Sequence, residues 1–477
     1  MAHHAPAPLS NTAAGTHRDP DRLLPAEPGV RAIARDLYAR TADAPIVSPH
    51  GHVPVDWLAD DTPFPNPAAL LITHDHYVTR LLHASGVSLA DLGLGDGEGT
   101  YPRDIWRAFA SRWHLFAGTA SGYWLEEELA GVLGVTERLT ASSADRVYDR
   151  IQEQLDKPEL RPRALFERFG IEVLATTDDP LDDLAGHAQL ARSGLKGRVL
   201  PTFRPDRYLD PHAAGFIDNL QKLLATTTSP TTFSGYLDAL RGRREHFLRH
   251  GATSTDHGVE DPYTVDLSPG EAETLFQTVM AGTASDAQIR DFRGHMLVRM
   301  AEMSVEDGLV MTVHAGVLRN HSSETLTQYG SDTGHDIPVR TDFTRGLRPL
   351  LERYGLARDF HLVLFAVDES VYSREIAPLA GFYPSVYIGA PWWFLDAPDA
   401  IGRFRSAVTE TAGFSRGSGF IDDTRAFLSI PARHDTARRA DAAFLGRLVA
   451  ESRIAMSDAE RIADDLVGPL PRRVFKL

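Results

Sequence analysis

Short apolar runs recur along the chain, and each ends in polar residues suited to catalysis. Residues 44–47 lead to Ser48-Pro49-His50-Gly51-His52, and residues 308–313 lead to His314. Similar runs begin near residues 171, 198, 253, 361, 385 and 418. Short β-branched runs bounded by glycine and proline are typical of buried strands. The pattern therefore predicts a series of strands with reactive side chains at their carboxyl ends.

The segments between these runs have helical patterns, for example residues 182–193, 398–412 and 436–452. Alternating strands and helices predict an α/β fold with a parallel sheet. Polar residues at the carboxyl ends of the strands are expected in a (β/α)8 TIM-type barrel, whose active site lies on that face. A doubly wound sheet also places its site there, so this pattern alone does not separate the two folds.

Two stretches depart from the alternation. Residues 66–163 are mainly helical and rich in aromatic residues, which predicts a helical insertion after the first strand that covers the site. Residues 1–28 are rich in alanine, proline and histidine and lack an apolar core, so we expect a mobile lead-in rather than a secretion signal. Residues 29–477 are then expected to form a single barrel domain.

Charge and composition narrow the partners. The 477 residues carry a net charge of −16, from 49 basic and 65 acidic residues, which disfavours nucleic acid as the main ligand. Local arginines can still bind a small anionic substrate. No apolar run is long enough to predict a membrane-spanning helix. The absence of cysteine excludes disulfides and thiolate chemistry, and fits the cytoplasmic location that we expect.

His50 and His52 are the sharpest chemical signal. Residues two apart on a strand face the same side, so both imidazoles can converge on one cation. Alternatively, both are loop histidines that only form hydrogen bonds. Asp423 and Arg425 follow the last run, where they could supply a metal ligand or base and an anion-stabilising cation, or simply form an ion pair.

Three other signals are equally ambiguous. Arg204 suits bidentate recognition of a carboxylate, but Pro205 also predicts a surface turn there. His314 could face a ligand or be a core histidine. The adjacent Trp392 and Trp393 could form a platform for a sugar ring or pack in the core.

Taken together, the chain resembles the uronate isomerase (glucuronate isomerase) family of the amidohydrolase superfamily. The resemblance covers about residues 44–450 and depends on the order of several segments rather than on any one. These segments are His50-Gly51-His52, Asp75-His76-Tyr77, Thr176-Thr177-Asp178-Asp179-Pro180, residues 200–206, Asp256-His257, residues 314–320, Trp392-Trp393-Phe394, residues 423–429 and Arg433-His434-Asp435.

The resemblance implies a distorted (β/α)8 barrel and an aldose–ketose isomerase that interconverts glucuronate with fructuronate, or galacturonate with tagaturonate, by moving a proton between C2 and C1. It also implies a divalent metal, zinc or manganese, as cofactor. The implied metal ligands are His50, His52 and Asp423; the implied catalytic residues are Tyr77, Asp423, Arg425 and His314; and the implied substrate-binding residues are Arg204, His76, Trp392 and Trp393.

Two positions depart from the family pattern. Ser48 stands where the family commonly has an aspartate, which removes a carboxylate that could support the histidines. The segment around Asp368-Glu369 matches poorly, which leaves the preferred sugar open.

Two other functions compete with isomerisation. A mononuclear metal-dependent hydrolase of the same superfamily, such as a lactonase or esterase, is the nearer alternative. A sugar-acid binding protein without activity is the other, although it would not need a base beside the metal ligands. A homo-oligomer is expected for either enzyme.

Overall fold

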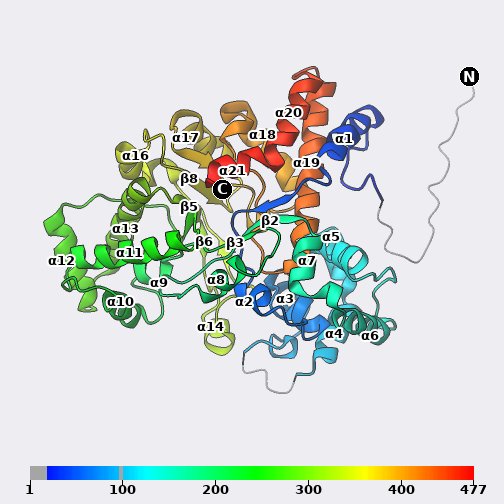
Figure 1. Cartoon of the computed structure of the whole chain (residues 1–477), viewed down its shortest axis with the longest axis horizontal. Helices are drawn as coiled ribbons and strands as arrows, with labels where there is room; N and C mark the ends of the chain where they lie inside the picture. Colours follow the sequence, from blue (N-terminus) through cyan, green and yellow to red (C-terminus); the bar gives the residue numbers. More distant parts are fainter. Residues whose placement is uncertain (1–18, 96–99) are drawn as a thin grey trace, which may run out of the picture.

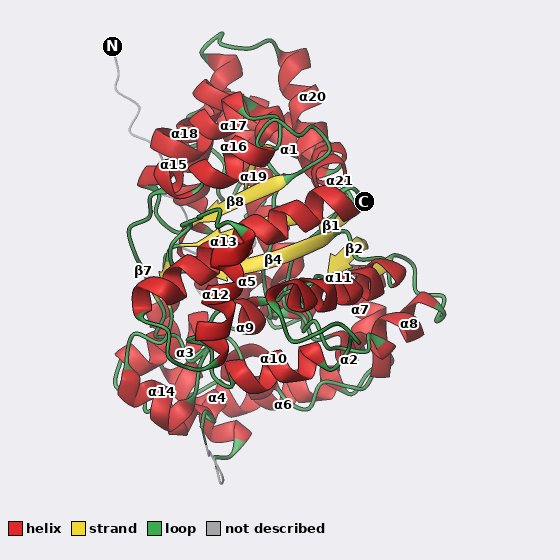
Figure 2. Cartoon of the chain, turned by 90° about the vertical axis from the view of Figure 1, so that its left-hand side faces the viewer, coloured by secondary structure: helices red, strands yellow, loops and turns green. Residues whose placement is uncertain are grey.

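Parallel strands form the centre of the protein (Figures 1 and 2). The structure is a computed structural model, which describes residues 19–95 and 100–477. One sheet has the order β1-β2-β3 and a second has the order β4-β5-β8-β9, with every neighbouring pair parallel. Their bounds are β1 Ile46–Ser48, β2 Ile171–Ala175, β3 Arg198–Leu200, β4 Ser254–Val259, β5 Val310–Ala315, β8 Leu362–Ala366 and β9 Val386–Ile388.

The two sheets continue one another. Phe203, just past β3, forms a parallel bridge with Thr255 of β4, and Gly417 bridges in the same way to Ile388 of β9. The strands therefore follow one another in sequence order, as in a (β/α)8 barrel, whereas a doubly wound sheet reverses direction at a switch point. The fold class expected from the sequence is confirmed. No continuous ladder closes the barrel among the described residues, which makes it a distorted one.

The last barrel segment differs from the sequence prediction. The run beginning at residue 418 was expected to be a strand, but it contributes only the single bridge of Gly417. Gly419 has φ 78°, which interrupts an extended conformation. The segment still lies beside the residues that follow β1, because the backbone N–H of His52 donates to the carbonyl of Thr424 at 3.0 Å.

The chain between β1 and β2 forms the expected helical insertion, which lies at the lower right of Figure 1. Its helices pack around a separate apolar core that includes Leu71, Trp106, Phe109 and Phe166. Their bounds are α2 Val55–Asp60, α3 His76–Ala84, α4 Pro102–Ser111, α5 Ala120–Glu127, α6 Ala144–Leu155 and α7 Pro162–Arg168.

The other helices lie outside the strands (Figure 2). Local sequence explains several of their ends: α12 and α13 each begin with a serine capping box, at Ser268 and Ser285, and α13 ends at Gly308 with φ 83°. The bounds are α8 Ala185–Ala191, α9 Asp206–Leu209, α10 Phe216–Leu224, α11 Phe233–Arg249, α12 Pro269–Met280, α13 Asp286–Asp307, α15 Phe343–Gly346, α16 Arg348–Tyr354, α17 Ala377–Phe382, α18 Pro398–Ala412, α19 Ile430–Ala450, α20 Met456–Val467 and α21 Pro469–Phe475.

One excursion was not expected from the sequence. After β5 the chain forms a small antiparallel hairpin of β6 (Val317–Leu318) and β7 (Ile337–Pro338), which encloses α14 (Ser323–Tyr329). None of the α14 residues is buried. The excursion therefore projects from the carboxyl ends of the strands, where the active site of a barrel lies.

The described part of the predicted lead-in contacts the barrel. Residues 1–18 lie outside the described residues. Arg22 pairs with Asp435 at 2.8 Å, and Arg439 donates to the carbonyl of Pro20 at 2.8 Å. Helix α1 (Pro28–Thr41) follows and packs against α19 and α20. Among the described residues, no helix has the length and apolar character needed to cross a membrane.

Candidate active site

A cavity of about 600 Å³ opens at the carboxyl ends of the strands. It is lined by residues of the barrel, the helical insertion and the β6–β7 excursion. The structure thus brings together side chains that the sequence analysis selected from distant segments. The predicted site residues in the lining are His52, His76, Tyr77, Arg204, His314, Trp392, Trp393, Asp423 and Arg425.

His50, His52 and Asp423 form a cluster able to hold a metal ion. Asp423 Oδ1 lies 3.3 Å from His50 Nε2 and 2.9 Å from His52 Nε2. The backbone of Asp423 has φ 42°, a strained value for a residue with a Cβ, which turns its side chain toward the two imidazoles. Its Oδ1 atom is buried and has no hydrogen-bond partner among the described residues. Two imidazole nitrogens and a carboxylate oxygen are a donor set that fits a divalent cation.

The charges in this cluster favour an ionised carboxylate. Burial alone raises the pKa of the Asp423 carboxyl, but the neighbouring His50 and His52 outweigh it and hold the pKa well below its usual range. Burial also lowers the pKa of His52, which favours the neutral form that binds metals. The Ser48 hydroxyl and His50 Nδ1 are both buried without a hydrogen-bond partner among the described residues. The carboxylate missing at Ser48 is therefore not replaced there.

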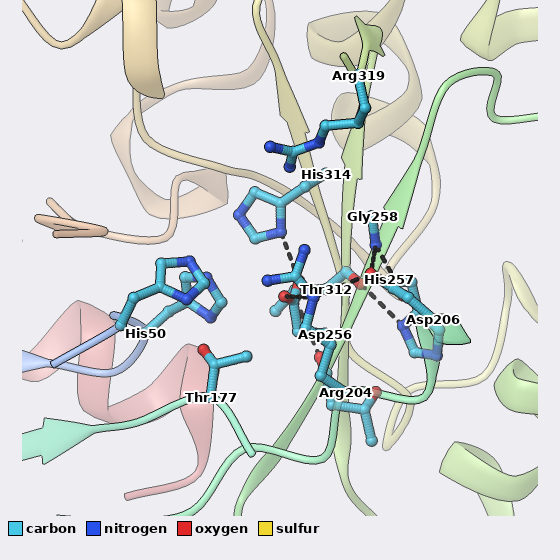
Figure 3. Close-up of polar contacts among 12 residues, drawn as sticks. His50, Thr177, Arg204, Asp206, Asp256, His257, Gly258, Thr312, His314 and Arg319 are labelled. Carbon is cyan, nitrogen blue, oxygen red and sulfur yellow. Dashed lines mark hydrogen bonds and ion pairs between the residues drawn. The ribbon is translucent and has the colours of Figure 1, made fainter. Parts of the chain in front are cut away.

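A second buried cluster adjoins the first (Figure 3). Asp256 Oδ1 accepts a hydrogen bond from Thr312 at 3.1 Å and lies 2.6 Å from His314 Nδ1. The rings of His314 and His50 stack with their centres 4.7 Å apart. Burial raises the pKa of Asp256, but the charges of His314 and Arg204 hold it well below its usual range. Asp256 lies within β4, whereas the sequence pattern placed it after the strand.

Arg204 is enclosed by carboxylates. Its Nε lies 2.9 Å from Asp206 Oδ2 and 3.4 Å from Asp256 Oδ2. Asp206 is itself fixed by the backbone N–H of Gly258, at 3.1 Å from both carboxylate oxygens (Figure 3). Burial lowers the pKa of Arg204, but the two aspartates raise it overall. Arg204 is thus a fixed cation whose remaining N–H groups can face the cavity.

The insertion contributes His76 and Tyr77 at the start of α3. Asp75 caps this helix by accepting from the backbone N–H of Tyr77 at 2.8 Å. Burial lowers the pKa of His76 to about 3, so its imidazole is neutral at neutral pH. Burial likewise raises the pKa of the Tyr77 phenol, which keeps it protonated. The ring of His76 lies 5.1 Å from that of Trp393.

Both tryptophans are buried and both line the cavity. Trp392 contacts His314 edge to face at 4.7 Å between ring centres. Trp393 has a positive φ of 51°. Arg425, which also lines the cavity, pairs with Asp332 of the β6–β7 excursion at 3.1 Å.

Several lining residues were not selected as site residues from the sequence. Arg319 pairs with Asp336 at 3.0 Å and lies over the ring of Trp393, and Arg433 also lines the cavity although it is only 1% exposed. Arg319 and Arg433 belong to segments that carry the family resemblance, so a signal for them existed. Asp332 lies in a polar stretch with no pattern that could have marked it.

A parallel barrel with a His-x-His pair and an aspartate at its first and last strand ends defines a class of enzymes that act with a bound divalent cation. Among the described residues that line the cavity there is no lysine, and Glu260 is the one glutamate.

Comparison with known proteins identifies the family within this class. Residues 30–470 match the family model of glucuronate isomerase. A uronate isomerase of Corynebacterium efficiens is 53% identical over 461 residues, which cover 96% of this chain and 98% of that protein. One of Xanthomonas campestris is 51% identical over 462 residues, with 96% and 98% covered. The chain belongs to the glucuronate isomerase family.

Solved structures agree with this assignment. The crystal structure of glucuronate isomerase from Caulobacter crescentus superposes with a TM-score of 0.95 at 46% identity, covering 97% of each chain. The uronate isomerase of Thermotoga maritima gives 0.90 at 26% identity, covering 96% of this chain and 99% of that one. The family resemblance and the aldose–ketose isomerase class expected from it are thereby confirmed.

Proposed function

We propose that the protein interconverts an aldo-uronate and a keto-uronate, D-glucuronate with D-fructuronate or D-galacturonate with D-tagaturonate. The observation that carries the proposal is that His52 and Asp423, which cluster with the buried His50, line one cavity together with Tyr77 and Arg425. Isomerisation through an enediolate requires metal ligands, a group such as a phenol that can transfer a proton, and a cation such as arginine that stabilises the enediolate charge.

The substrate is held in its open-chain form. Arg204 binds its carboxylate, because the guanidinium is already fixed by Asp206 and Asp256 and so loses little freedom on binding. His76 and His314 orient hydroxyl groups, and Trp392 and Trp393 pack against the carbon chain. The neutral state of His76 lets its imidazole either donate or accept a hydrogen bond.

The reaction moves one proton between carbon atoms, from C2 to C1. A base removes the proton from C2, its electron pair forms the C1–C2 double bond, and the C1 carbonyl oxygen gains negative charge. Protonation at C1, together with transfer of the O2 proton to O1, then gives the C2 ketone and the C1 hydroxyl group. A divalent cation held by His50, His52 and Asp423 would polarise the carbonyl. Arg425 stabilises the enediolate charge, and Asp423 and Tyr77 hold and move the proton.

The two proton-handling groups have different resting states. Asp423 is ionised, since His50 and His52 depress its pKa, and it can therefore accept a proton. Tyr77 is protonated, because burial raises its pKa, and it can therefore donate one. This difference supports Asp423 as the base and Tyr77 as the proton donor.

Proton NMR tests the proposal. The purified protein is incubated in deuterated water with D-glucuronate or D-galacturonate, after chelation and then with zinc or manganese added. We expect the C2–H signal to decline as the ketose appears, with the faster sugar identifying the preferred uronate. Absence of ketose with both sugars and both metals would refute isomerisation, and lactone and ester hydrolysis would then be measured.

The remaining expectations are finer than the family assignment. We propose zinc as the resident metal, because two imidazoles and a carboxylate suit it, with manganese as the alternative. Metal analysis of the protein as purified distinguishes them. A cytoplasmic location and a homo-oligomeric assembly stay predictions from the sequence.

A further inference from the structure

Arg433 is a buried cation in the lining of the cavity, and the proposed chemistry does not use it. It lies in the first turn of α19, and only 1% of its side chain is exposed. Its Nη1 donates to Asp396 Oδ2 at 2.8 Å, and its Nε donates to Ser429 Oγ at 3.0 Å. The guanidinium is thus fixed in position and orientation from two sides.

The same guanidinium contacts the helical insertion. Its Cζ lies 3.6 Å from the ring centre of Trp124 in α5 and 5.2 Å from that of Tyr77 in α3. The two rings meet edge to face, 5.5 Å apart. Arg433 therefore lies against the two aromatic side chains through which the insertion meets the barrel floor, with cation–π contacts to both.

Arg433 also reaches the segment that carries Asp423. Its Nη1 donates to the backbone carbonyl of Asp422 at 3.3 Å. The next residue, Asp423, has the strained φ of 42°. A strained conformation persists only where surrounding contacts fix it, and this hydrogen bond is one such contact.

A stability role alone does not explain this arrangement. Removing a guanidinium and a carboxylate from water costs free energy, and a buried pair is often no more stabilising than apolar residues of the same size. The other contacts of Arg433 instead join the insertion, which supplies Tyr77, to the segment that supplies Asp423. Such contacts give a defined geometry rather than net stability.

We propose that Arg433 is a positioning residue, which fixes the Tyr77 hydroxyl relative to the Asp423 carboxylate by binding α3, α5 and the Asp422 carbonyl at once. The inference rests on the proposed roles of Tyr77 and Asp423 in proton transfer. The charge of Arg433 also acts on Tyr77. Burial raises the pKa of the Tyr77 phenol, and the positive charge of Arg433 partly opposes that rise.

The test compares two conservative variants. Arg433→Lys keeps the charge but loses the planar guanidinium that contacts both rings and the Asp422 carbonyl. The control is Arg405→Lys: Arg405 is also buried in an ion pair, with Asp441 at 2.6 and 2.9 Å, but it does not line the cavity. Both variants weaken a buried arginine–aspartate pair, and only one is expected to misplace Tyr77.

We expect Arg433→Lys to lower kcat by about a hundredfold with little change in KM, because a misplacement of about 1 Å at reacting groups has that effect. Arg405→Lys should keep the wild-type kcat in its folded fraction. Guanidinium ion at a non-denaturing concentration should restore part of the kcat of Arg433→Ala. Equal kcat in the two lysine variants, or a failure of guanidinium to raise the kcat of folded Arg433→Ala, would overturn the inference.

Two further variants keep the test decisive. If Arg433→Lys does not fold, Asp396→Asn, which retains Arg433 and weakens one of its anchors, should still lower kcat several-fold at constant KM; an unchanged kcat would refute the positioning role. Tyr77→Phe separates this failure from that of the proposed chemistry. If Tyr77→Phe is fully active the role of Tyr77 is wrong, whereas inactive Tyr77→Phe with active Arg433→Lys contradicts only the role of Arg433.

Discussion

Replacing Asp423 by asparagine isolates the charge on which the proposed chemistry depends. The side chains have nearly the same volume, and the position is 10% exposed, so the fold should be retained. The amide, however, carries no charge and cannot accept a proton at neutral pH. The oxygen that is lost as an anion lies 2.9 Å from His52 and 3.3 Å from His50, so both the metal set and the base change together.

The expected magnitude follows from these two losses. A positioned general base contributes about 10²- to 10⁴-fold to the rate, so we expect kcat to fall by at least about a thousandfold, or about 4 kcal/mol in the activation free energy. Removal of a metal ligand should in addition lower the metal content of the purified variant.

The assay measures three quantities on one sample: ketose formation by NMR, metal content by elemental analysis, and the thermal unfolding midpoint. Asp441→Asn is the matched control, because Asp441 is a buried aspartate that pairs with Arg405 away from the cavity. It should unfold at a lower temperature and keep its kcat. A metal-loaded Asp423→Asn variant with near wild-type kcat would refute the assignment of Asp423 as base.

Three further predictions concern binding, pH and packing. Arg204→Ala should raise KM more than it lowers kcat, and steady-state kinetics showing the larger effect in kcat would assign Arg204 another role. The hydrogen bond from Arg472 lowers the pKa of Glu172 from its usual value of 4.5. This partly exposed pair should therefore add about 0.5–1 kcal/mol to the free energy of unfolding above pH 4.5. The contribution is lost as the pH falls through the lowered pKa. Denaturant unfolding of Glu172→Gln at pH 7 and pH 3 should therefore show a deficit only at pH 7. Gly122→Ala should destabilise the insertion by about 3 kcal/mol, because the added Cβ would lie 2.1 Å from the carbonyl oxygen of Phe116; an unchanged unfolding midpoint would contradict this.

The sequence was sufficient for the order of the barrel strands because each apolar run is short, β-branched and separated from the next by a helix. It failed where tertiary contacts replace local pattern. The segment near residue 418 looks like a strand, yet Gly419 adopts a positive φ there. The β6–β7 excursion is polar and irregular, so neither helical nor strand periodicity marks it.

The candidate site shows the same division. His50 and His52 are separated by only one residue and point to a metal site without knowledge of the fold. Asp332 could not be found, because its partner Arg425 is brought to it only by the fold. The burial of Arg433 was equally invisible, since its partners come from α3, α5 and the segments around Asp396 and Asp422.

The weak pairing of the final barrel segment has a consequence for the order of assembly. Its backbone pairs with β9 through the bridge of Gly417 on one side, and it accepts a hydrogen bond from His52 at Thr424 on the other. The cluster of His50, His52 and Asp423 spans this same seam. Because the first two residues are synthesised early and the third near the end, a growing chain has no competent centre until almost the whole barrel has been made. A cation bound by all three residues would then link the first and last segments of the barrel.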